Sequence, residues 1–364
     1  MLVVTHACNL NCTYCYEAHK GNRNMTFLTA VDCLERELAL VRADEKFREI
    51  EVQFMGGEPF MAFSLIKDIV SWLKVNAGDI PWICSCSTNG TLVDDETKQW
   101  LEVNRECFVP CLSYDGDDEM QKCNRGYGRG VVDLGYFLRV WPFQHLHMTV
   151  SKETLPNLCR GIVAVHKQGG RVDLALAQGV DWNNEDARIF DEQLCLLAQF
   201  YLDNPAYEPV NVLTRMLFDI PSSKCAQVKF CGTGTHMVAY DVDGQPYGCH
   251  MFTPVVMGDV ESKKCLEAID WERECSFSDP YCETCLYRGW CPTCCGFNLR
   301  FRGNLATRDH RWCGMIQIQV LRACEFQLKY FGKFKDKLSG ADVQQLEGVI
   351  RTYDAIHKKE RRRK

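Results

Sequence analysis

The first part of the chain alternates short apolar runs with longer stretches in which apolar residues recur every three or four positions. Runs of about four to eight residues bounded by turn residues predict buried strands, and the longer spacing predicts helices with one face in the core. Alternation of this kind is typical of an α/β protein with a parallel sheet. The predicted strands are Leu2–Thr5, Glu51–Phe54, Trp82–Cys86, Phe108–Leu112, His145–Val150 and Arg171–Gln178.

Helical spacing appears between these runs and again near the carboxyl end. The first predicted helix can begin at Thr29, whose side chain is a good N-cap. Another helix is predicted from about Asp186 to Asp203, and Met315 to Phe331 is an apolar-rich helical run. The apolar stripes of the first two helices and of the last one are Val31, Leu34, Leu38 and Val41; Phe63, Ile66, Val70 and Leu73; and Val343, Leu346, Ile350 and Tyr353.

Three cysteines follow the first predicted strand on one short loop. Cys8, Cys12 and Cys15 have the spacing C-x3-C-x2-C. Thiolates are soft ligands that select zinc, copper(I) or iron–sulfur clusters, and this spacing lets three of them hold three corners of a cubane while the fourth iron stays open. A structural zinc site would need a fourth ligand nearby. His6 or His19 could supply it, so the zinc alternative stays open at this point.

Glycine and polar residues follow the next three predicted strands. Gly56-Gly57-Glu58-Pro59 comes after the second strand, and glycines let backbone groups approach a ligand closely. An ordinary strand-to-helix turn would use the same residues. Ser87-Thr88-Asn89-Gly90 and Ser113-Tyr114-Asp115-Gly116 end the third and fourth strands. Ligands bind at the carboxyl ends of parallel strands, although Asn-Gly and Asp-Gly also favour turns.

Cysteine density rises sharply in the last part of the chain. The spacing is C-x5-C, then a cysteine that ends G-x4-C, then C-x2-C-x5-C-x3-C, and a last cysteine after a gap. Eight thiolates divide evenly into two sets of four. The candidates are Cys225, Cys231, Cys249, Cys282, Cys285, Cys291, Cys295 and Cys313. A zinc ribbon of Cys282, Cys285, Cys291 and Cys294 is the local alternative, but it leaves Cys225, Cys231, Cys249 and Cys313 unexplained.

Length and composition limit the domain count, the cellular compartment and the partners. At 364 residues the chain is long enough for one large α/β domain and a smaller one. Twenty-three cysteines would suit a secreted disulfide scaffold, but the sequence opens on a strand and its metal loop without a signal peptide, so we expect a reducing cytoplasm. The net charge of −6 gives no general case for nucleic acid as a partner. No apolar run approaches the ~20 residues that cross a bilayer.

The order of these motifs resembles the radical S-adenosylmethionine (SAM) enzymes, which carry a C-x3-C-x2-C loop after the first strand and Gly-Gly-Glu-Pro after the second. The resemblance implies an α/β fold, with the partial (β/α)6 TIM-type barrel of the radical SAM fold over residues 1–215. The later cysteines resemble the SPASM domain. That likeness implies a cysteine-rich C-terminal SPASM domain with C-terminal helices over residues 216–364.

The resemblance also implies cofactors and their residues. We expect three [4Fe–4S] clusters, one that binds SAM and two that are auxiliary, together with SAM itself. Cys8, Cys12 and Cys15 would hold the SAM-binding cluster. By the same likeness, Gly56, Gly57 and Glu58 would orient the methionine end of SAM, Tyr14 would lie against its adenine side, and Ser113 and Asp115 would make polar contacts to its methionine or ribose part.

The SPASM resemblance divides the eight later thiols into interleaved sets. Cys225, Cys231, Cys249 and Cys295 would hold the first auxiliary cluster, and Cys282, Cys285, Cys291 and Cys313 the second. The pattern favours Cys295 over its neighbour Cys294, although spacing does not prove which one binds. Two auxiliary clusters suggest a path for the second electron that an oxidised substrate must lose.

Radical SAM enzymes split SAM to obtain a 5′-deoxyadenosyl radical, which takes a hydrogen atom from an unactivated C–H bond. The overall pattern resembles the anaerobic sulfatase-maturating type, which oxidises a cysteine or serine to formylglycine. That family carries an acidic residue as proposed base after the G-x4-C cysteine, whereas Cys249 is followed by His250. Histidine accepts a proton near neutral pH, so His250 is the candidate base. A histidine merely packed beside the cluster is an equal alternative.

The change at that position favours a different substrate. The first functional hypothesis is a maturase that installs an oxidative crosslink, a thioether or a carbon–carbon bond, in a ribosomally synthesised peptide (a RiPP). Formylglycine formation on a protein is the alternative, and a non-catalytic iron–sulfur electron carrier or a zinc-stabilised binding protein is the third, although a carrier needs no Gly-Gly-Glu-Pro. The expected partners are a peptide or protein substrate and an electron donor such as flavodoxin or ferredoxin, with no nucleic acid and no membrane. No leader-binding domain precedes the predicted barrel, so substrate recognition is expected on the barrel and SPASM surfaces or from a separate partner.

Overall fold

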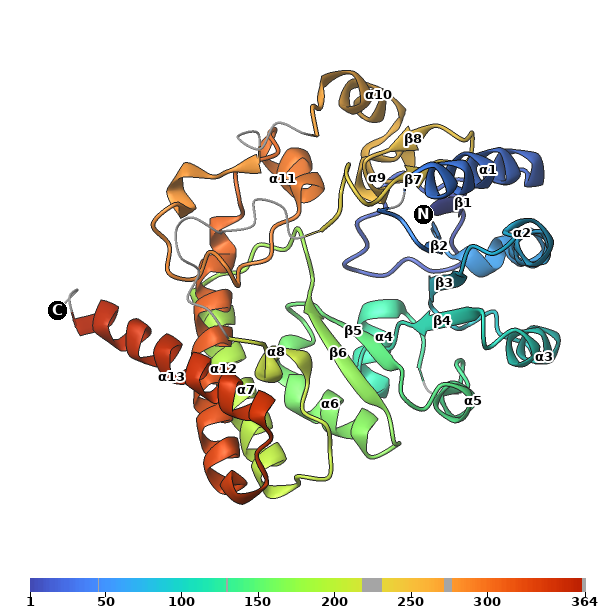
Figure 1. Cartoon of the computed structure of the whole chain (residues 1–364). Coiled ribbons are helices and arrows are strands. Elements are labelled where there is room, and N and C mark those ends of the chain that lie inside the picture. Colours follow the sequence, from blue (N-terminus) through green and yellow to red (C-terminus); the bar gives the residue numbers. More distant parts are fainter. Residues whose placement is uncertain (45, 129, 218–230, 272–276, 362–364) are drawn as a thin grey trace. The chain divides into compact units, whose positions relative to one another are not determined.

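The computed structural model describes residues 1–44, 46–128, 130–217, 231–271 and 277–361 (Figure 1). Contacts between residues divide the chain into two compact units. The first unit comprises Met1–Tyr114, Gln121–His147 and Cys231–Arg273, and the second comprises Asp115–Met120, Met148–Phe230 and Glu274–Lys364. Each unit is thus built from discontinuous stretches. The domain boundary expected at 215/216 is a separate division and stays a prediction.

A six-stranded sheet lies at the centre of the first unit. Its order is β4-β3-β2-β1-β7-β8, and β1 to β4 pair in parallel. Because successive strands are neighbours and crossover connections are right-handed, the connecting helices all fall on one face. Figure 1 shows α1, α2 and α3 along that side of the strands. The strands are β1 (Leu2–Thr5), β2 (Ile50–Gly56), β3 (Trp82–Thr88), β4 (Phe108–Leu112), β7 (Ala239–Tyr240) and β8 (Pro246–Tyr247).

Helices of the first unit cover the buried face of these strands. Phe54 of β2 stacks on Phe108 of β4, and Trp100 of α3 packs edge-on against Phe108. The intervening side chains, such as Gln53 and Ser85, stay half-exposed on the other face. The helices and short 3-10 segments (η) are α1 (Phe27–Ala43), η1 (Pro59–Ala62), α2 (Phe63–Asn76), α3 (Asp95–Val103), α5 (Leu134–Val140), η3 (His250–Phe252), α9 (Pro254–Met257) and α10 (Asp259–Ala268).

The predicted N-cap of α1 is wrong by one turn. The helix begins at Phe27, and the N-cap is Thr26, whose Oγ1 accepts a hydrogen bond of 3.1 Å from the Thr29 backbone N–H. Thr29 therefore lies at the third helical position, where its hydroxyl pairs with that of Thr26 at 2.8 Å. The two threonines are equally good caps by sequence. Tertiary structure decides between them because the preceding Met25 N–H is bound to Val4 O of β1.

The hairpin of β7 and β8 is absent from the predicted strands. Leu2 of β1 pairs with Tyr240 of β7, so this late segment extends the sheet beside the first strand. Each strand of the hairpin has only two residues. A two-residue strand shows no alternation of apolar and polar positions, so the sequence pattern does not reveal it.

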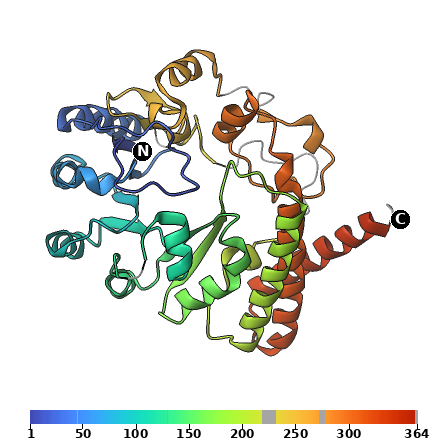
Figure 2. The ribbon, with the colours of Figure 1, turned by 180° about the vertical axis from the view of Figure 1, so that it is seen from behind.

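The second unit combines a pair of strands with long helices. β6 (Arg171–Leu176) pairs with β5 (His145–Val150), and α12 packs against α7, α8 and α13. Figures 1 and 2 both show α7 and α12 side by side. The division between units passes through β5 and α4. The helices and 3-10 segments that lie wholly or partly in this unit are α4 (Asp118–Arg125), η2 (Leu155–Asn157), α6 (Leu158–His166), α7 (Asn184–Asp203), α8 (Asn211–Thr214), η5 (Pro280–Cys282), α11 (Cys295–Arg302), η6 (His310–Trp312), α12 (Cys313–Lys333), η7 (Lys335–Lys337) and α13 (Gly340–Arg361).

All six predicted strands are present, and the α/β class with a parallel sheet is confirmed. The first four strands form the parallel part of one sheet, whereas β5 and β6 form a separate pair. A single parallel bridge between Ser113 and His147 connects the end of β4 to β5. Closure of six strands into a partial barrel therefore remains a prediction.

The last predicted helix exists, but its predicted apolar stripe is not the buried face. Val343 and Ile350 are each 45% exposed, whereas Gln345, Val349 and Thr352 are buried. Gln345 goes inward because its amide donates to Gln327 Oε1 of α12 at 2.6 Å and to a backbone carbonyl. A polar residue with partners can displace an apolar stripe from the core.

No helix among the described residues is long and apolar enough to cross a membrane.

Candidate functional site

The loop that carries the three N-terminal cysteines is clasped at both ends. The His6 N–H donates to Arg23 O at 2.9 Å, the Gly21 N–H donates to His6 O at 3.1 Å, and Thr5 forms an antiparallel bridge with Asn24. The chain thus leaves β1, makes an excursion and returns beside its starting point. These contacts close the loop at its base.

Within this loop the thiols of Cys8, Cys12 and Cys15 are all half-buried. The Leu10 N–H donates to Cys8 Sγ at 3.4 Å, and the Cys15 N–H donates to Cys12 O at 3.1 Å. Burial lowers the pKa of the Lys20 ammonium, but Cys15 and Cys8 raise it, and the pKa is raised overall. A cation beside thiols favours their thiolate form, which is the form that binds metals.

Gly56 and Gly57 bring the end of β2 against this loop. A Cβ on Gly56 would lie 2.2 Å from Thr5 O, and one on Gly57 would lie 2.3 Å from Ala7 O and 2.8 Å from Cys8 Cβ. Gly56 also has φ of 146°. The close approach lets the Gly57 N–H donate to Thr5 O at 3.1 Å and the Glu58 N–H donate to Ala7 O at 2.8 Å. Both glycines are required by the backbone beside the cysteine loop.

Glu58 is a buried carboxylate that joins strand ends. Oε1 accepts from Thr88 Oγ1 at 2.7 Å and from the Phe60 N–H at 3.2 Å, and Oε2 accepts from the Asn89 N–H at 2.8 Å. Burial raises the pKa of Glu58, although these three hydrogen bonds act in the opposite direction. Its carboxylate therefore holds the end of β3 against the end of β2.

The other predicted SAM contacts lie at strand ends or on the loop. Arg125 lies 5.7 Å from the centre of the Tyr14 ring, and Tyr14 is half-buried. Ser113 is half-buried, and its N–H donates to Thr88 O at 2.9 Å. Asp115 belongs to the second unit and is fully buried, with Oδ1 accepting from the Thr149 N–H at 2.9 Å.

The candidate base His250 lies in the first unit at the start of η3. Its Nε2 is 3.2 Å from Tyr16 Oη, and its buried Nδ1 has no hydrogen-bond partner among the described atoms. Burial lowers the pKa of His250 to about 4. The imidazole is therefore neutral near pH 7, and its tautomer decides whether Nδ1 donates or accepts a further hydrogen bond. Tyr16 was not a predicted site residue.

The zinc alternative with His6 as fourth ligand does not fit this geometry. His6 is buried, and its Nε2 lies 2.7 Å from Asp241 Oδ1. Its other ring nitrogen, Nδ1, lies 3.4 Å from Arg23 Nε. Both nitrogens are thus engaged by side chains, so His6 clamps the loop to the residues after β7. The other histidine proposed, His19, is exposed.

Four of the later thiols belong to the second unit and influence one another electrostatically. Burial raises the pKa of Cys282 to about 11 and that of Cys313 to about 11, and in each case Cys285 and Cys291 add to the effect through their charge. Cys285 acts in the same way on Cys291, and the Cys285 N–H donates to Cys282 O at 3.1 Å. Mutual electrostatic effects of this kind require short separations. These four residues are the predicted second auxiliary set.

The first auxiliary set is described only in part. Cys225 lies outside the described residues, and Cys295 is a buried residue of the second unit. Cys231 is exposed and Cys249 is buried in the first unit, where the Gly234 N–H donates to Gly248 O at 2.9 Å. Cys294, the alternative to Cys295, is the N-cap of α11.

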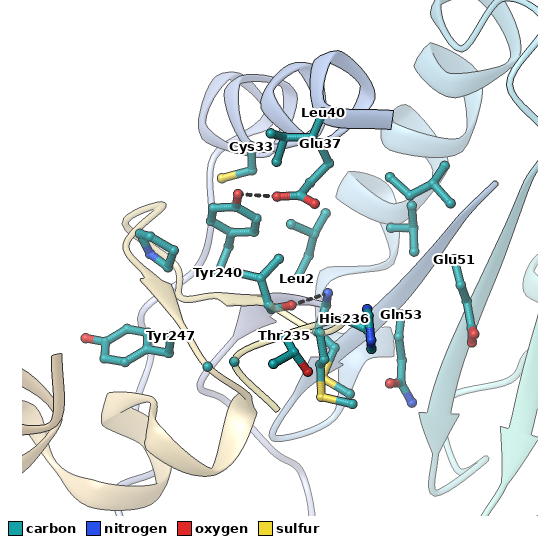
Figure 3. A pocket seen from close by; sticks show the side chains of 18 of the residues that line it. Leu2, Cys33, Glu37, Leu40, Glu51, Gln53, Thr235, His236, Tyr240 and Tyr247 are labelled. Atoms are coloured by element: carbon teal, nitrogen blue, oxygen red, sulfur yellow. Dashed lines mark hydrogen bonds between the residues drawn. The ribbon is translucent and has the colours of Figure 1, made fainter. Parts of the chain in front are cut away.

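A large cavity of about 610 Å³ lies elsewhere in the first unit, at the amino ends of β1 and β2 (Figure 3). On its wall, Tyr240 Oη donates to Glu37 Oε1 at 2.6 Å, and the Met1 amine donates to Val238 O at 2.8 Å. The cysteine loop follows the opposite, carboxyl end of β1. This cavity is therefore separate from the cysteine loop.

Sequence reasoning missed several polar residues that hold the site. The Asn89 amide donates to Asn9 Oδ1 at 2.9 Å, and Asn9 in turn donates to Thr91 Oγ1 at 2.7 Å. These bonds tie the cysteine loop to the end of β3. Lys20, described above, was also missed. The only sequence signal was the polar run after the third strand, because the loop side of each contact shows no pattern.

Comparison with known proteins identifies the amino-terminal part. Residues 2–129 match the family model described as the radical SAM superfamily. The matched segment contains Cys8, Cys12 and Cys15 and the Gly56-Gly57-Glu58 motif. The match spans the loop, the sheet β1 to β4 and the strand ends described above.

Several curated proteins are similar to this chain. A cysteine-type anaerobic sulfatase-maturating enzyme of Clostridium perfringens is 33% identical over 125 residues, which cover 32% of each protein. The radical SAM cyclopropyl synthase TigE of Paramaledivibacter caminithermalis is 30% identical over 115 residues, or 28% of this chain and 24% of TigE. The chain thus matches a third or less of the length of these two relatives. A serine-type anaerobic sulfatase-maturating enzyme of Klebsiella aerogenes is 25% identical over 338 residues, covering 85% of this chain and 80% of that protein.

Solved structures share the fold at lower identity. A His6-tagged anSMEcpe with bound AdoMet has a TM-score of 0.67 and 18% identity, covering 95% of this chain and 97% of that chain. The same enzyme with AdoMet and the Cp18Cys peptide gives 0.66, with 93% and 99% covered at 18% identity. Streptococcus suis SuiB bound to its precursor peptide SuiA gives 0.55, with 85% and 74% covered at 16% identity. At these identities the likeness concerns the α/β fold. The match to the radical SAM superfamily covers residues 2–129, so the family likeness is shown for this amino-terminal segment.

Proposed function

We propose that this protein is a radical SAM maturase that oxidatively modifies a side chain of a ribosomally synthesised peptide, forming a thioether or carbon–carbon crosslink. The observation that carries the proposal is the presence of two separate thiol groups, one on the loop after β1 and one in the second unit. The first suits SAM chemistry and the second suits electron storage. Solved neighbours of the same fold were captured with peptides, which supports a peptide substrate.

The family implies a [4Fe–4S] cluster with SAM, and the residues of the loop fit such a group. Cys8, Cys12 and Cys15 offer three soft donors, all half-exposed, and Lys20 lies beside two of them. We infer that these three thiolates hold the cluster and leave one iron for SAM. When bound, the cluster and SAM together supply a 5′-deoxyadenosyl radical, and the task of the protein is to aim it and exclude water.

The residues around the loop would orient SAM. Gly56 and Gly57 leave space in which backbone groups can approach the methionine end, and Tyr14 and the half-buried Ser113 remain the proposed contacts to the rest of SAM. Glu58 acts in this proposal through the strand ends that it holds, because its oxygens already accept three hydrogen bonds. Asp115 would act in the same indirect way, since it is buried and bonded to the Thr149 N–H.

Removal of two electrons from a peptide requires an acceptor for the second one. We propose that Cys282, Cys285, Cys291 and Cys313 hold an auxiliary [4Fe–4S] cluster for this purpose. The mutual electrostatic influence of these thiols supports this set. Cys225, Cys231, Cys249 and Cys295 are proposed as the other auxiliary set. An electron donor such as flavodoxin or ferredoxin and a cytoplasmic setting belong to the same proposal.

Formylglycine formation is the second candidate. It is favoured by the likeness to a sulfatase-maturating enzyme over 85% of this chain. The residue after Cys249 supports the peptide crosslink instead. His250 provides an imidazole at the position where the sulfatase-maturating family carries an acidic residue as proposed base. In either reaction the free Nδ1 of His250 would accept the proton that the substrate loses. A non-catalytic carrier has no use for the motifs within residues 2–129.

One experiment separates these candidates. The reconstituted and reduced full-length enzyme is incubated anaerobically with SAM and with peptides encoded beside its gene, and the products are weighed and sequenced by mass spectrometry. A crosslinked peptide that has lost two hydrogens supports the proposal. Conversion of a cysteine or serine to an aldehyde supports formylglycine formation, and absence of both deoxyadenosine and product contradicts an enzymatic role. The His250→Ala variant should lose product; unchanged turnover would remove His250 as the base.

A further inference from the structure

Arg308 is a buried cation beside the thiols of the second unit. The residue is 5% exposed, and its Nη1 donates to Cys291 O at 3.2 Å. Its positive charge also acts on the Cys291 thiol. The same charge acts on Cys282. The guanidinium thus contacts one proposed ligand and influences a second.

The backbone of Arg308 is held by Asp279. Asp279 is buried, and its Oδ2 accepts from the Arg308 N–H at 2.9 Å and lies 2.9 Å from His310 Nε2. Its Oδ1 accepts from the Tyr281 N–H at 2.9 Å, which fixes the turn that leads to Cys282. One carboxylate therefore positions both the segment before Cys282 and the segment before Cys313.

Asp309 and Arg311, which follow Arg308 on the same segment, are engaged by other side chains. Asp309 pairs with Arg302 and with Arg311, and Arg311 also reaches Asp181 at 2.8 Å. Arg311 lies on the same short segment as Arg308, but its side chain is 41% exposed and all its recorded contacts are with carboxylates. The segment thus places one arginine toward the thiols and another toward solvent.

We propose that Arg308 is a positioning residue that sets the reduction potential of the cluster held by Cys282, Cys285, Cys291 and Cys313. The proposal rests on the proposed function, because it assumes that auxiliary cluster. A thiolate-bound cluster becomes more negative on reduction, so a fixed buried cation next to one of its ligands stabilises the reduced form. Arg308 should therefore raise the potential and make this cluster the better acceptor of the substrate electron.

The test uses the full-length protein with Cys8, Cys12 and Cys15 all changed to Ala, so that auxiliary clusters alone contribute. Redox titrations followed by electron paramagnetic resonance compare this background with added Arg308→Gln, Arg308→Lys or Arg311→Gln, and iron is counted in each. Arg308→Gln should shift one midpoint to more negative values with iron retained. Arg308→Lys should stay nearer the parent because it keeps the charge, and Arg311→Gln should leave both midpoints unchanged.

Three outcomes would overturn the proposal. Unchanged midpoints in Arg308→Gln would remove the electrostatic role. Loss of about four irons from both Arg308 variants would assign Arg308 to cluster assembly alone. A parent without auxiliary iron would remove the cluster on which the proposal depends. The titration needs no peptide, so a shifted midpoint in an enzyme that forms no peptide product would contradict the proposed function and leave this inference standing.

Discussion

At the scale of single residues, the site depends on a few residues that lie directly against the backbone of neighbouring segments. Gly56 and Gly57 are required because Thr5 O and Ala7 O lie where their Cβ atoms would be. The Glu58 carboxylate can be buried because three hydrogen-bond donors, at the ends of η1 and β3, take the place of water. Each of these residues supports the cysteine loop from the neighbouring strands.

The glycine contacts predict a sharp difference between variants. Gly56→Ala and Gly57→Ala should each cost about 3 kcal/mol or more, because backbone must move to admit the new methyl group. Both should also lower the iron bound at the amino-terminal site. Gly21→Ala, on the same loop with nothing within 4 Å, is the control and should behave as the parent. Thermal unfolding and iron analysis measure the two effects; equal stability of all three variants would contradict this account.

A buried histidine predicts a pH effect on stability. His166 Nδ1 lies 2.9 Å from Gly170 O, and its Nε2 lies 2.7 Å from Tyr201 Oη. Burial lowers the pKa of His166 despite the hydrogen bond to Gly170. The unfolded chain then binds the proton more readily, so the contribution is present above the ordinary histidine pKa of ~6.5 and is lost as the pH falls below it.

His166→Gln should therefore reduce the drop in melting temperature between about pH 7.5 and about pH 5.5, which bracket that pKa. Melting curves at both pH values provide the measurement. The control is His236→Gln, a change at an exposed histidine that should keep the parental pH dependence. A parental drop in both variants would show that His166 does not carry the effect.

At the scale of elements, caps and polar pairs decide where helices begin and which face they bury. Asn183 caps α7, because its Oδ1 accepts from the Glu185 N–H at 2.8 Å and from the Asp186 N–H at 3.1 Å. In turn, the Asp186 carboxylate accepts from the Asn183 N–H. This capping box makes the amino end of the helix well defined. In α13 the paired amides of Gln345 and Gln327 select the buried face in the same local way.

Removal of the α7 cap tests this local control. Asn183→Ala should lower the free energy of unfolding by about 1 kcal/mol because two helix N–H groups lose their acceptor. Asn184→Ala changes the next residue, which is exposed and has no recorded cap bond, and should be close to neutral. The comparison is made by chemical denaturation; similar losses in both variants would argue against the capping box as the cause.

At the scale of the whole molecule, the proposed chemistry is divided between an amino-terminal thiol loop and a later thiol set that belongs to another compact unit. If each proposed set binds one cluster, Cys313→Ala should lose about four of about twelve irons. SAM cleavage should persist in that variant because the amino-terminal thiols are intact.

Cys195→Ala is the matched control, since Cys195 is an exposed thiol on α7 outside every proposed set. It should retain the full iron content. Iron and sulfide analysis with a deoxyadenosine assay measures both properties. Full iron in Cys313→Ala would exclude Cys313 as a ligand and reopen the set that uses Cys294.

The sequence by itself determined the order of the six predicted strands, the α/β class and the likeness of residues 2–129 to the radical SAM superfamily, because these depend on short-range periodicity and on fixed spacings such as C-x3-C-x2-C. Only the tertiary structure decided which threonine caps α1, that β7 joins the sheet beside β1, and which face of α13 is buried. It also decided that His6 binds Asp241 and Arg23 and that Arg308 faces Cys291. Each of these outcomes depends on a partner far away in the chain, and a local pattern carries no information about a partner that folding brings to it.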